Sequence, residues 1–105
     1  MIVVKAFAAL ADPTRQQIVE LLASTPELPA GKIAESFPSM TRAAVSRHLR
    51  TLEDSGLLAV RTRAQQRLYR LNPEPLDELD RWLERYRGMW TRKIGALKDR
   101  LESRS

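Results

Sequence analysis

A stripe of apolar side chains at helical spacing fills the last third of the chain and constrains its fold more than any other feature. Eight such residues recur between Leu76 and Leu101 at steps of 3, 4, 3, 4, 4, 3 and 4 residues, which predicts one long helix with a nearly heptad-spaced apolar face. At about 1.5 Å per residue the stripe spans roughly 38 Å, longer than a core built from 105 residues can cover. Part of the stripe is therefore expected to contact another chain.

Two helices are predicted in the first quarter of the chain. An apolar segment that includes Val4 predicts a helix that stops near Leu10. Asp12 then provides a side chain that can cap the next helix, and Pro13 suits its first position because proline has no amide proton to leave unpaired. The apolar spacing continues this second helix to Ser24, where a proline-rich stretch breaks it.

A helix-turn-helix is predicted at about residues 30–55. A helix of about two turns is expected over 30–37, before Pro38 interrupts it. The next helix begins after Thr41, whose hydroxyl can cap it, and ends before Gly56, which suits the left-handed conformation that follows many helices. The face of this helix opposite its apolar residues is small and basic, as expected of a helix that enters a groove, and consists of Arg42, Ala43, Ser46, Arg47 and Arg50.

Alternating residues predict a β-hairpin wing at about residues 57–71. Apolar and polar side chains alternate from Leu58 to Arg63, and the alternation resumes at Leu68. The segment 64–66 connects the two strands. The hairpin carries arginines around its tip.

The basic residues are concentrated in one part of the sequence. The formal net charge is +5, and residues 41–70 carry seven arginines against Glu53 and Asp54. The other 75 residues hold eleven basic and eleven acidic side chains, so that part of the chain is neutral. A concentrated cationic segment of this kind needs an anionic partner.

Composition excludes several classes of function. The chain has no cysteine, which removes disulfides, thiolate metal sites and iron–sulfur clusters. Its one histidine, His48, cannot form a multi-histidine metal site, and its four glycines form no phosphate-binding loop. No apolar stretch approaches the roughly 20 residues of a membrane span, and the start lacks the basic region of a signal peptide. We expect a cytoplasmic protein that is not an enzyme, with no cofactor, no metal and no membrane partner.

Four motifs resemble the ArsR/SmtB family of bacterial winged-helix repressors. They are Leu10-Ala11-Asp12-Pro13-Thr14-Arg15, Val45-Ser46-Arg47-His48-Leu49, Leu52-Glu53-Asp54-Ser55-Gly56-Leu57 and Arg67-Leu68-Tyr69-Arg70-Leu71. The resemblance covers nearly the whole chain and implies a single winged helix-turn-helix domain over 1–105. This domain is mainly α, with a small β-hairpin wing and the order α-α-α-α-β-β-α. The implied function is sequence-specific transcription regulation by a homodimer that represses its own promoter region.

The resemblance also assigns site residues. Ser46 and Arg47 match base-reading positions, with phosphate contact as the alternative, whereas His48 either contacts DNA or packs at the edge of its helix. The expected contacts to double-stranded DNA are Thr41, Arg42, Ser46, Arg47, His48, Arg50, Arg61, Arg63 and Arg67. The homodimer is expected to be clasped through the first helix and the last one, at about 74–103. Its expected interface residues are Val4, Phe7, Leu79, Trp82, Leu83, Tyr86, Trp90, Ile94 and Leu97.

The sequence departs from the metal-sensing members of this family. The Cys-x-Cys pair of those members corresponds to Pro29 and Gly31 here, and the last helix has no histidine. The aromatic residues of that helix resemble a cysteine-free subset whose genes often neighbour START-like proteins. The resemblance therefore implies a signal other than a metal.

Two other functions and one further partner stay open. A winged-helix module could bind a protein instead of DNA, although the basic face of the 41–55 helix argues against that function. A metal-responsive repressor could use carboxylates and His48 at the dimer interface. An unidentified effector could bind beside Trp82, Tyr86 and Trp90, although aromatic residues at helical spacing more often form a core or a dimer interface.

Overall fold

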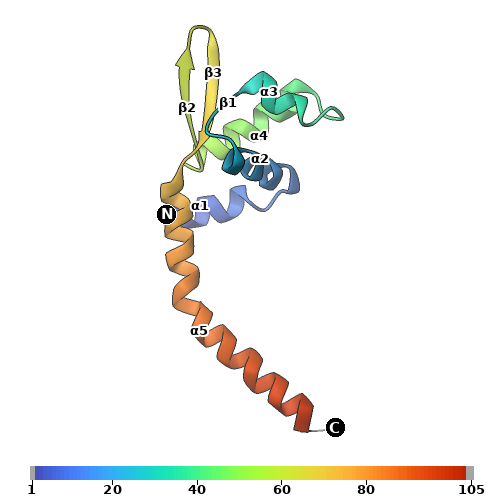
Figure 1. The fold of residues 1–105 in the computed structure, drawn as a ribbon, viewed down its shortest axis with the longest axis vertical. Coiled ribbons are helices and arrows are strands. Elements are labelled where there is room, and N and C mark those ends of the chain that lie inside the picture. Colours follow the sequence, from blue (N-terminus) through green and yellow to red (C-terminus); the bar gives the residue numbers. More distant parts are fainter. Residues whose placement is uncertain (1, 104–105) are drawn as a thin grey trace.

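The computed structural model describes residues 2–103 and consists of a winged-helix body from which one long helix projects (Figure 1). The elements in chain order are α1 (Ile2–Ala9), α2 (Pro13–Ser24), β1 (Leu28–Pro29), α3 (Ala30–Glu35), α4 (Arg42–Asp54), β2 (Leu58–Arg63), β3 (Gln66–Leu71) and α5 (Pro73–Ser103). This arrangement confirms the predicted winged helix-turn-helix fold and adds one short strand, β1, to the expected order.

The ends of α2 and α4 follow from local chemistry. At the start of α2 the Asp12 carboxylate accepts a hydrogen bond of 3.0 Å from the Arg15 amide, and a proline occupies the first helical turn. At the start of α4 the Thr41 hydroxyl accepts a hydrogen bond of 3.1 Å from the Ala44 amide. Gly56 follows α4 with a φ of 85°, in the left-handed region that glycine adopts without steric cost. Both caps and the glycine confirm the sequence prediction.

The three strands form an antiparallel sheet in the order β1-β3-β2. β2 and β3 pair over their full lengths, which leaves Ala64 and Gln65 as the turn at the tip of the wing. β1 adds Leu28 opposite Tyr69 on the other edge of β3. This two-residue strand was not predicted, because it is too short to show alternation and lies in a stretch whose prolines indicate a break.

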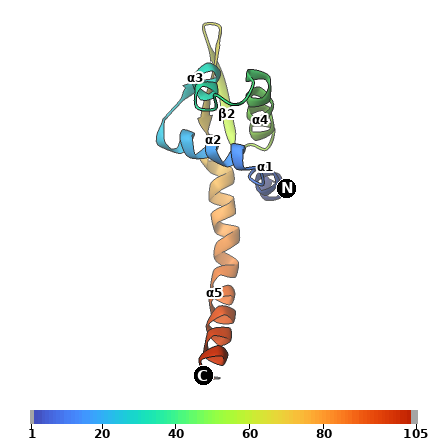
Figure 2. The same ribbon diagram turned by 90° about the vertical axis from the view of Figure 1, so that its right-hand side faces the viewer.

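The core lies between the four short helices and the inner face of the sheet. Its most completely buried large side chains are Ile18, Ile33, Val45, Leu49, Leu52 and Leu57. α5 reaches this core only near its start and then leaves the body (Figure 2). Leu79 retains 6% exposure there, so the single chain already covers it, whereas the other residues predicted for the dimer interface are exposed. Within residues 2–103, no helix is both long and apolar enough to span a membrane.

Candidate nucleic-acid interface

α4 has one apolar side and one polar side. Val45, Leu49 and Leu52 are buried, and their spacing of four and three residues puts them on the side of the helix that packs on the core. The other side of α4 is exposed to solvent and is formed by Arg42, Ala43, Ser46, Arg47 and Arg50. The fold therefore presents the small and basic face of this helix outward, where it can enter a groove.

Arg61 on β2 is paired with an acidic side chain from outside the basic segment. Its Nε and Nη2 donate hydrogen bonds of 2.6 and 2.7 Å to the two carboxylate oxygens of Glu27. The hydrogen bond from Arg61, helped by the charges of Arg61, Arg70 and Arg63, holds the pKa of Glu27 below its ordinary value. The same hydrogen bond raises the pKa of Arg61. Glu27 therefore neutralises part of the outer face of the wing.

Arg67 on β3 connects the wing to α4. Its Nη2 donates a hydrogen bond of 3.1 Å to Oε2 of Glu53, and its Nε donates one of 3.2 Å to the Tyr69 hydroxyl. The guanidinium carbon lies 5.9 Å from the centre of the Tyr69 ring, within the range of a cation–π contact. The hydrogen bond with Tyr69 and the negative charge of Glu53 raise the pKa of Arg67. These contacts hold the guanidinium at the junction of the wing and α4.

A polar hollow of about 530 Å³ lies between α4 and the wing. It combines guanidinium groups from both elements with two carboxylates at the end of α4 and a tyrosine ring from β3. Its lining residues are Ser46, Arg47, Arg50, Glu53, Asp54, Arg67 and Tyr69. The hollow therefore carries both signs of charge, and which groups are paired decides what it can bind.

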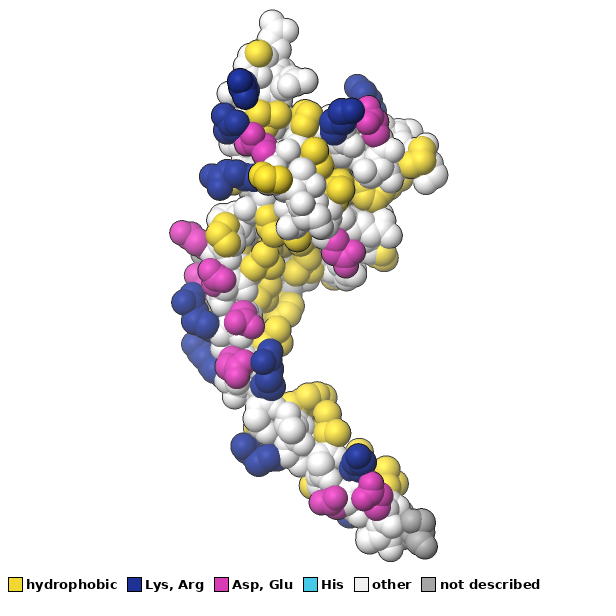
Figure 3. All heavy atoms as spheres, viewed as in Figure 1, with side chains coloured by type: hydrophobic (Ala, Val, Ile, Leu, Met, Phe, Trp, Pro, Cys, Tyr) yellow, Lys and Arg dark blue, Asp and Glu magenta, His cyan; other side chains and the backbone are white. Residues whose placement is uncertain are grey.

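The ion pairs divide the arginines of the predicted DNA site into two groups. Arg61 and Arg67 are each paired with a glutamate. The other four, considered within residues 2–103, make no ion pair with a carboxylate: Arg42, Arg47, Arg50 and Arg63. Figure 3 shows basic side chains along one edge of the wing with acidic ones beside them. The unpaired group is the one available to an external anion without loss of an internal contact.

His48 lies at the contact between α4 and the start of α2. Its Nδ1 is 3.4 Å from Nη1 of Arg15 and 3.9 Å from the Asp12 carboxylate. Its side chain is 21% exposed, whereas the neighbouring Arg47 is exposed. This position favours the structural role over the DNA contact among the two alternatives for His48.

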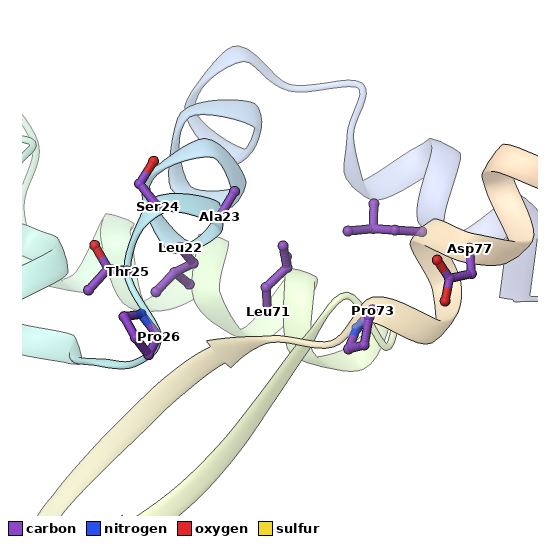
Figure 4. A pocket seen from close by; sticks show the side chains of 9 residues that line it. Leu22, Ala23, Ser24, Thr25, Pro26, Leu71, Pro73 and Asp77 are labelled. Carbon is purple, nitrogen blue, oxygen red and sulfur yellow. The ribbon is translucent and has the colours of Figure 1, made fainter.

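A second hollow, of about 500 Å³, lies between the end of α2 and the junction of β3 with α5 (Figure 4). Its lining side chains are mostly apolar and include Leu22, Leu71 and Pro73, with Asp77 at one end. None of its lining residues is basic. This hollow therefore does not belong to the nucleic-acid interface.

The predicted dimer residues form an exposed apolar face on α1 and α5. The Phe7 and Trp82 rings meet edge to face with 5.4 Å between their centres, and the Trp82 and Tyr86 rings are 4.8 Å apart. Hydrophobic side chains continue along the inner side of α5 in Figure 3. The other exposed members of the predicted set are Val4, Leu83, Trp90, Ile94 and Leu97, and the structure adds Met89 and Leu101.

Three comparisons relate this chain to known proteins. Residues 10–61 match a helix-turn-helix domain family. The HTH-type transcriptional regulator Rv2034 of Mycobacterium tuberculosis is 38% identical over 99 residues, which cover 94% of this chain and 88% of that protein. The arsenical resistance operon repressor of Staphylococcus xylosus is 35% identical over 75 residues, which cover 71% and 70%. An ArsR-like transcriptional regulator from Rhodococcus sp. RHA1 has a solved structure with a TM-score of 0.74 and 31% identity, covering 93% of this chain and 91% of that chain.

A winged helix-turn-helix with an exposed basic recognition helix defines a DNA-binding protein of the transcriptional regulator class. The identity and coverage of the relatives extend this assignment from the class to a family. The chain belongs to the ArsR family of winged helix-turn-helix transcriptional regulators. Members of this family are transcriptional regulators and not enzymes, which confirms the predicted regulator class and the prediction that the chain is not an enzyme.

Proposed function

We propose that a homodimer of this chain binds a pseudo-palindromic operator and represses transcription from its own promoter region. The observation that carries the proposal is the exposed side of α4, where Arg47 and Arg50 make no ion pair within residues 2–103. A guanidinium free of carboxylates can donate to O6 and N7 of guanine in the major groove. We propose repression and not activation because the relative from Staphylococcus xylosus is named as an operon repressor.

Residues of α4 divide into base-reading and phosphate-binding groups. Ser46 and Arg47 lie near the middle of the exposed face and are assigned to base edges. Thr41 caps the helix, so the free amides beside it can also attract a phosphate. Arg42 and Arg50 are placed at the two ends of the exposed face, where guanidinium groups meet the backbone on either side of the groove.

Residues of the wing also divide into two groups. Arg63 is exposed next to the turn and makes no ion pair within residues 2–103, so it is assigned to a flanking phosphate or a narrow minor groove. Arg61 and Arg67 are instead assigned to holding the wing in place, because each already has a glutamate partner. His48 is assigned to the α2–α4 contact and is removed from the DNA-binding set.

The apolar face of α1 and α5 supports the homodimer. Trp90 is 64% exposed and Phe7 is 40% exposed in the single chain, a costly arrangement for large apolar side chains that gather on one face. A second copy that covers this face would carry a second α4. Two recognition helices would then read two half-sites about one helical turn, or a multiple of it, apart.

The test uses a labelled fragment of the promoter upstream of the protein's own gene and a scrambled fragment of equal length. Arg47→Ala is expected to relax or abolish the preference for the promoter fragment, because it removes a base contact. Arg63→Ala is expected to weaken binding to both fragments by a similar factor. It should also make the slope of log K against log salt shallower by about 0.9, since one phosphate contact is lost.

Arg85→Ala serves as the matched control, because it removes the same charge from an exposed position on α5. This variant is expected to bind both fragments as the parent does. The assignment is wrong if Arg47→Ala keeps the full preference for the promoter fragment, or if Arg63→Ala binds as Arg85→Ala does.

A further inference from the structure

We propose that Glu53 lowers the DNA affinity of this protein by keeping Arg67 from a phosphate. The inference rests on the proposed function, because it concerns the same DNA-binding surface. Glu53 lies near the C-terminal end of α4 and Arg67 is on β3, so their ion pair crosses from the recognition helix to the wing. The Glu53 carboxylate thus acts as an internal competitor for the anion that Arg67 would otherwise bind.

The position of Arg67 makes it a natural phosphate ligand. In a winged-helix complex the recognition helix occupies the major groove while the wing reaches the adjoining backbone or minor groove. The sugar-phosphate strand that separates two neighbouring grooves must therefore pass between the helix and the wing. The hollow lined by Ser46, Arg50 and Arg67 lies in that place, and its arginines are the groups that would meet this strand.

The Glu53 carboxylate opposes that contact in two ways. It holds Nη2 of Arg67 at 3.1 Å, which occupies part of the fork that would grip a phosphate. It also places a negative charge in the hollow that the strand would cross. Both side chains are partly exposed, at 56% for Arg67 and 32% for Glu53, so solvent weakens the pair and the competition with phosphate stays close to balance.

Two other carboxylates provide controls that distinguish the release of an arginine from the removal of a negative charge in the hollow. Asp54 lines the same hollow but makes no ion pair within residues 2–103, so its removal deletes a charge without releasing an arginine. Glu27 is paired with Arg61 in the same chemical way. Arg61 is directly opposite Leu68 and therefore shares its face of the sheet, whereas Arg67 lies one position along β3 and is on the other face. Removal of the Glu27 charge releases an arginine away from the hollow.

The experiment compares Glu53→Gln with Asp54→Asn and Glu27→Gln in titrations of the full chain against the promoter fragment. Glu53→Gln is expected to bind about fivefold more tightly at about 0.15 M salt, because release of one more counterion contributes that factor. Its slope of log K against log salt should be steeper by about 0.9. The scrambled fragment should gain affinity in the same proportion, because a phosphate contact carries no sequence information. Asp54→Asn and Glu27→Gln are each expected to change affinity by less than about twofold.

Three outcomes decide the proposal. The expected gain and steeper slope, confined to Glu53→Gln and reproduced by Glu53→Ala, support it. A Glu53→Gln variant that binds no better than Asp54→Asn would overturn it, because Glu53 would then be one of several nearby charges. Weaker binding by Glu53→Gln would overturn it too, since Glu53 would then position Arg67 for DNA. Failure of the proposed function is a separate result, seen when the parent protein itself shows no preference for the promoter fragment.

Discussion

Arg15 at the start of α2 and His48 in the middle of α4 meet where those helices pack, with 3.4 Å between Nη1 and Nδ1. The Nε of Arg15 also donates a hydrogen bond of 2.5 Å to the Ala9 carbonyl at the end of α1. Asp12 completes the group at 3.9 Å from His48. Side chains from two separated sequence motifs therefore form one contact, which fixes the recognition helix α4 against α2 and the end of α1.

His48→Ala is expected to lower the free energy of unfolding by about 1 kcal/mol, because it removes a largely covered side chain from the α2–α4 contact. Urea denaturation measures this change. The same variant should keep the salt slope of promoter binding unchanged, since His48 is not assigned to a phosphate. A shallower slope would show instead that His48 contacts DNA.

Two carboxylates make the stability of the fold depend on pH. The backbone hydrogen bond from Arg15 lowers the pKa of Asp12, and the side-chain hydrogen bond from Arg61 lowers the pKa of Glu27. Because these values lie below the ordinary 3.8 and 4.5, both groups hold protons more weakly in the folded state. Their stabilisation is present above the ordinary values and is lost as the pH falls through the lowered ones. The melting temperature should therefore drop between about pH 5 and about pH 3.

Glu27→Gln isolates one of these contributions. The variant is expected to melt below the parent at about pH 6 and to approach it as the pH falls through the lowered pKa of Glu27, below which Glu27 is protonated in the folded and the unfolded state. Glu20→Gln, at an exposed site on α2 without an ion pair within residues 2–103, is the control and should follow the parent throughout. A difference between Glu27→Gln and the parent that is constant with pH would contradict the role given to the Glu27–Arg61 pair.

Most of the fold could be predicted because its causes are local. The caps at Asp12 and Thr41, the glycine after α4 and the apolar spacing of each helix all act within a few residues. β1 could not be predicted, since Leu28 is extended only through pairing with Tyr69, more than forty positions away. The burial of Leu79 within the single chain could not be predicted either, because the stripe alone does not say how far the body extends along α5.

The sequence could predict which residue types form the candidate site, but not which of its arginines form ion pairs with glutamates. The basic side of α4 follows from helical geometry alone. The partners of Arg61 and Arg67 do not, since Glu27 is 34 positions from Arg61 and Glu53 is 14 positions from Arg67. A charge count along the sequence treats all seven arginines as equal, whereas the fold brings Glu27 to the wing and leaves only part of the cluster free.

Ala64 at the tip of the wing has a φ of 58°, in the left-handed region where a side chain with a Cβ atom is strained. Ala64→Gly is expected to raise the free energy of unfolding by roughly 0.5 kcal/mol, since relief of about 1 kcal/mol of strain is partly offset by the greater freedom of glycine in the unfolded chain. Urea denaturation measures the gain. Ala59→Gly in β2, where φ is not positive, should instead lower stability, and the same loss at both positions would contradict the strained turn.

Trp90→Glu tests the apolar face of α5 as the dimer interface. Trp90 is 64% exposed in the single chain, so the substitution should leave the fold intact, whereas a carboxylate buried between two copies is costly. We expect the dimer dissociation constant to rise at least about tenfold, equivalent to about 1.4 kcal/mol, in sedimentation equilibrium.

Arg85→Glu is the matched control. Arg85 comes two residues after Leu83 and therefore lies on roughly the opposite side of the helix from the apolar face. It introduces the same glutamate and is expected to leave the dimer unchanged. An equal loss of dimer in both variants would point to the overall charge of α5 as the cause. A Trp90→Glu protein that stays dimeric would place the interface on another face. In either case the two copies of α4 would need a different arrangement from the one proposed for the operator.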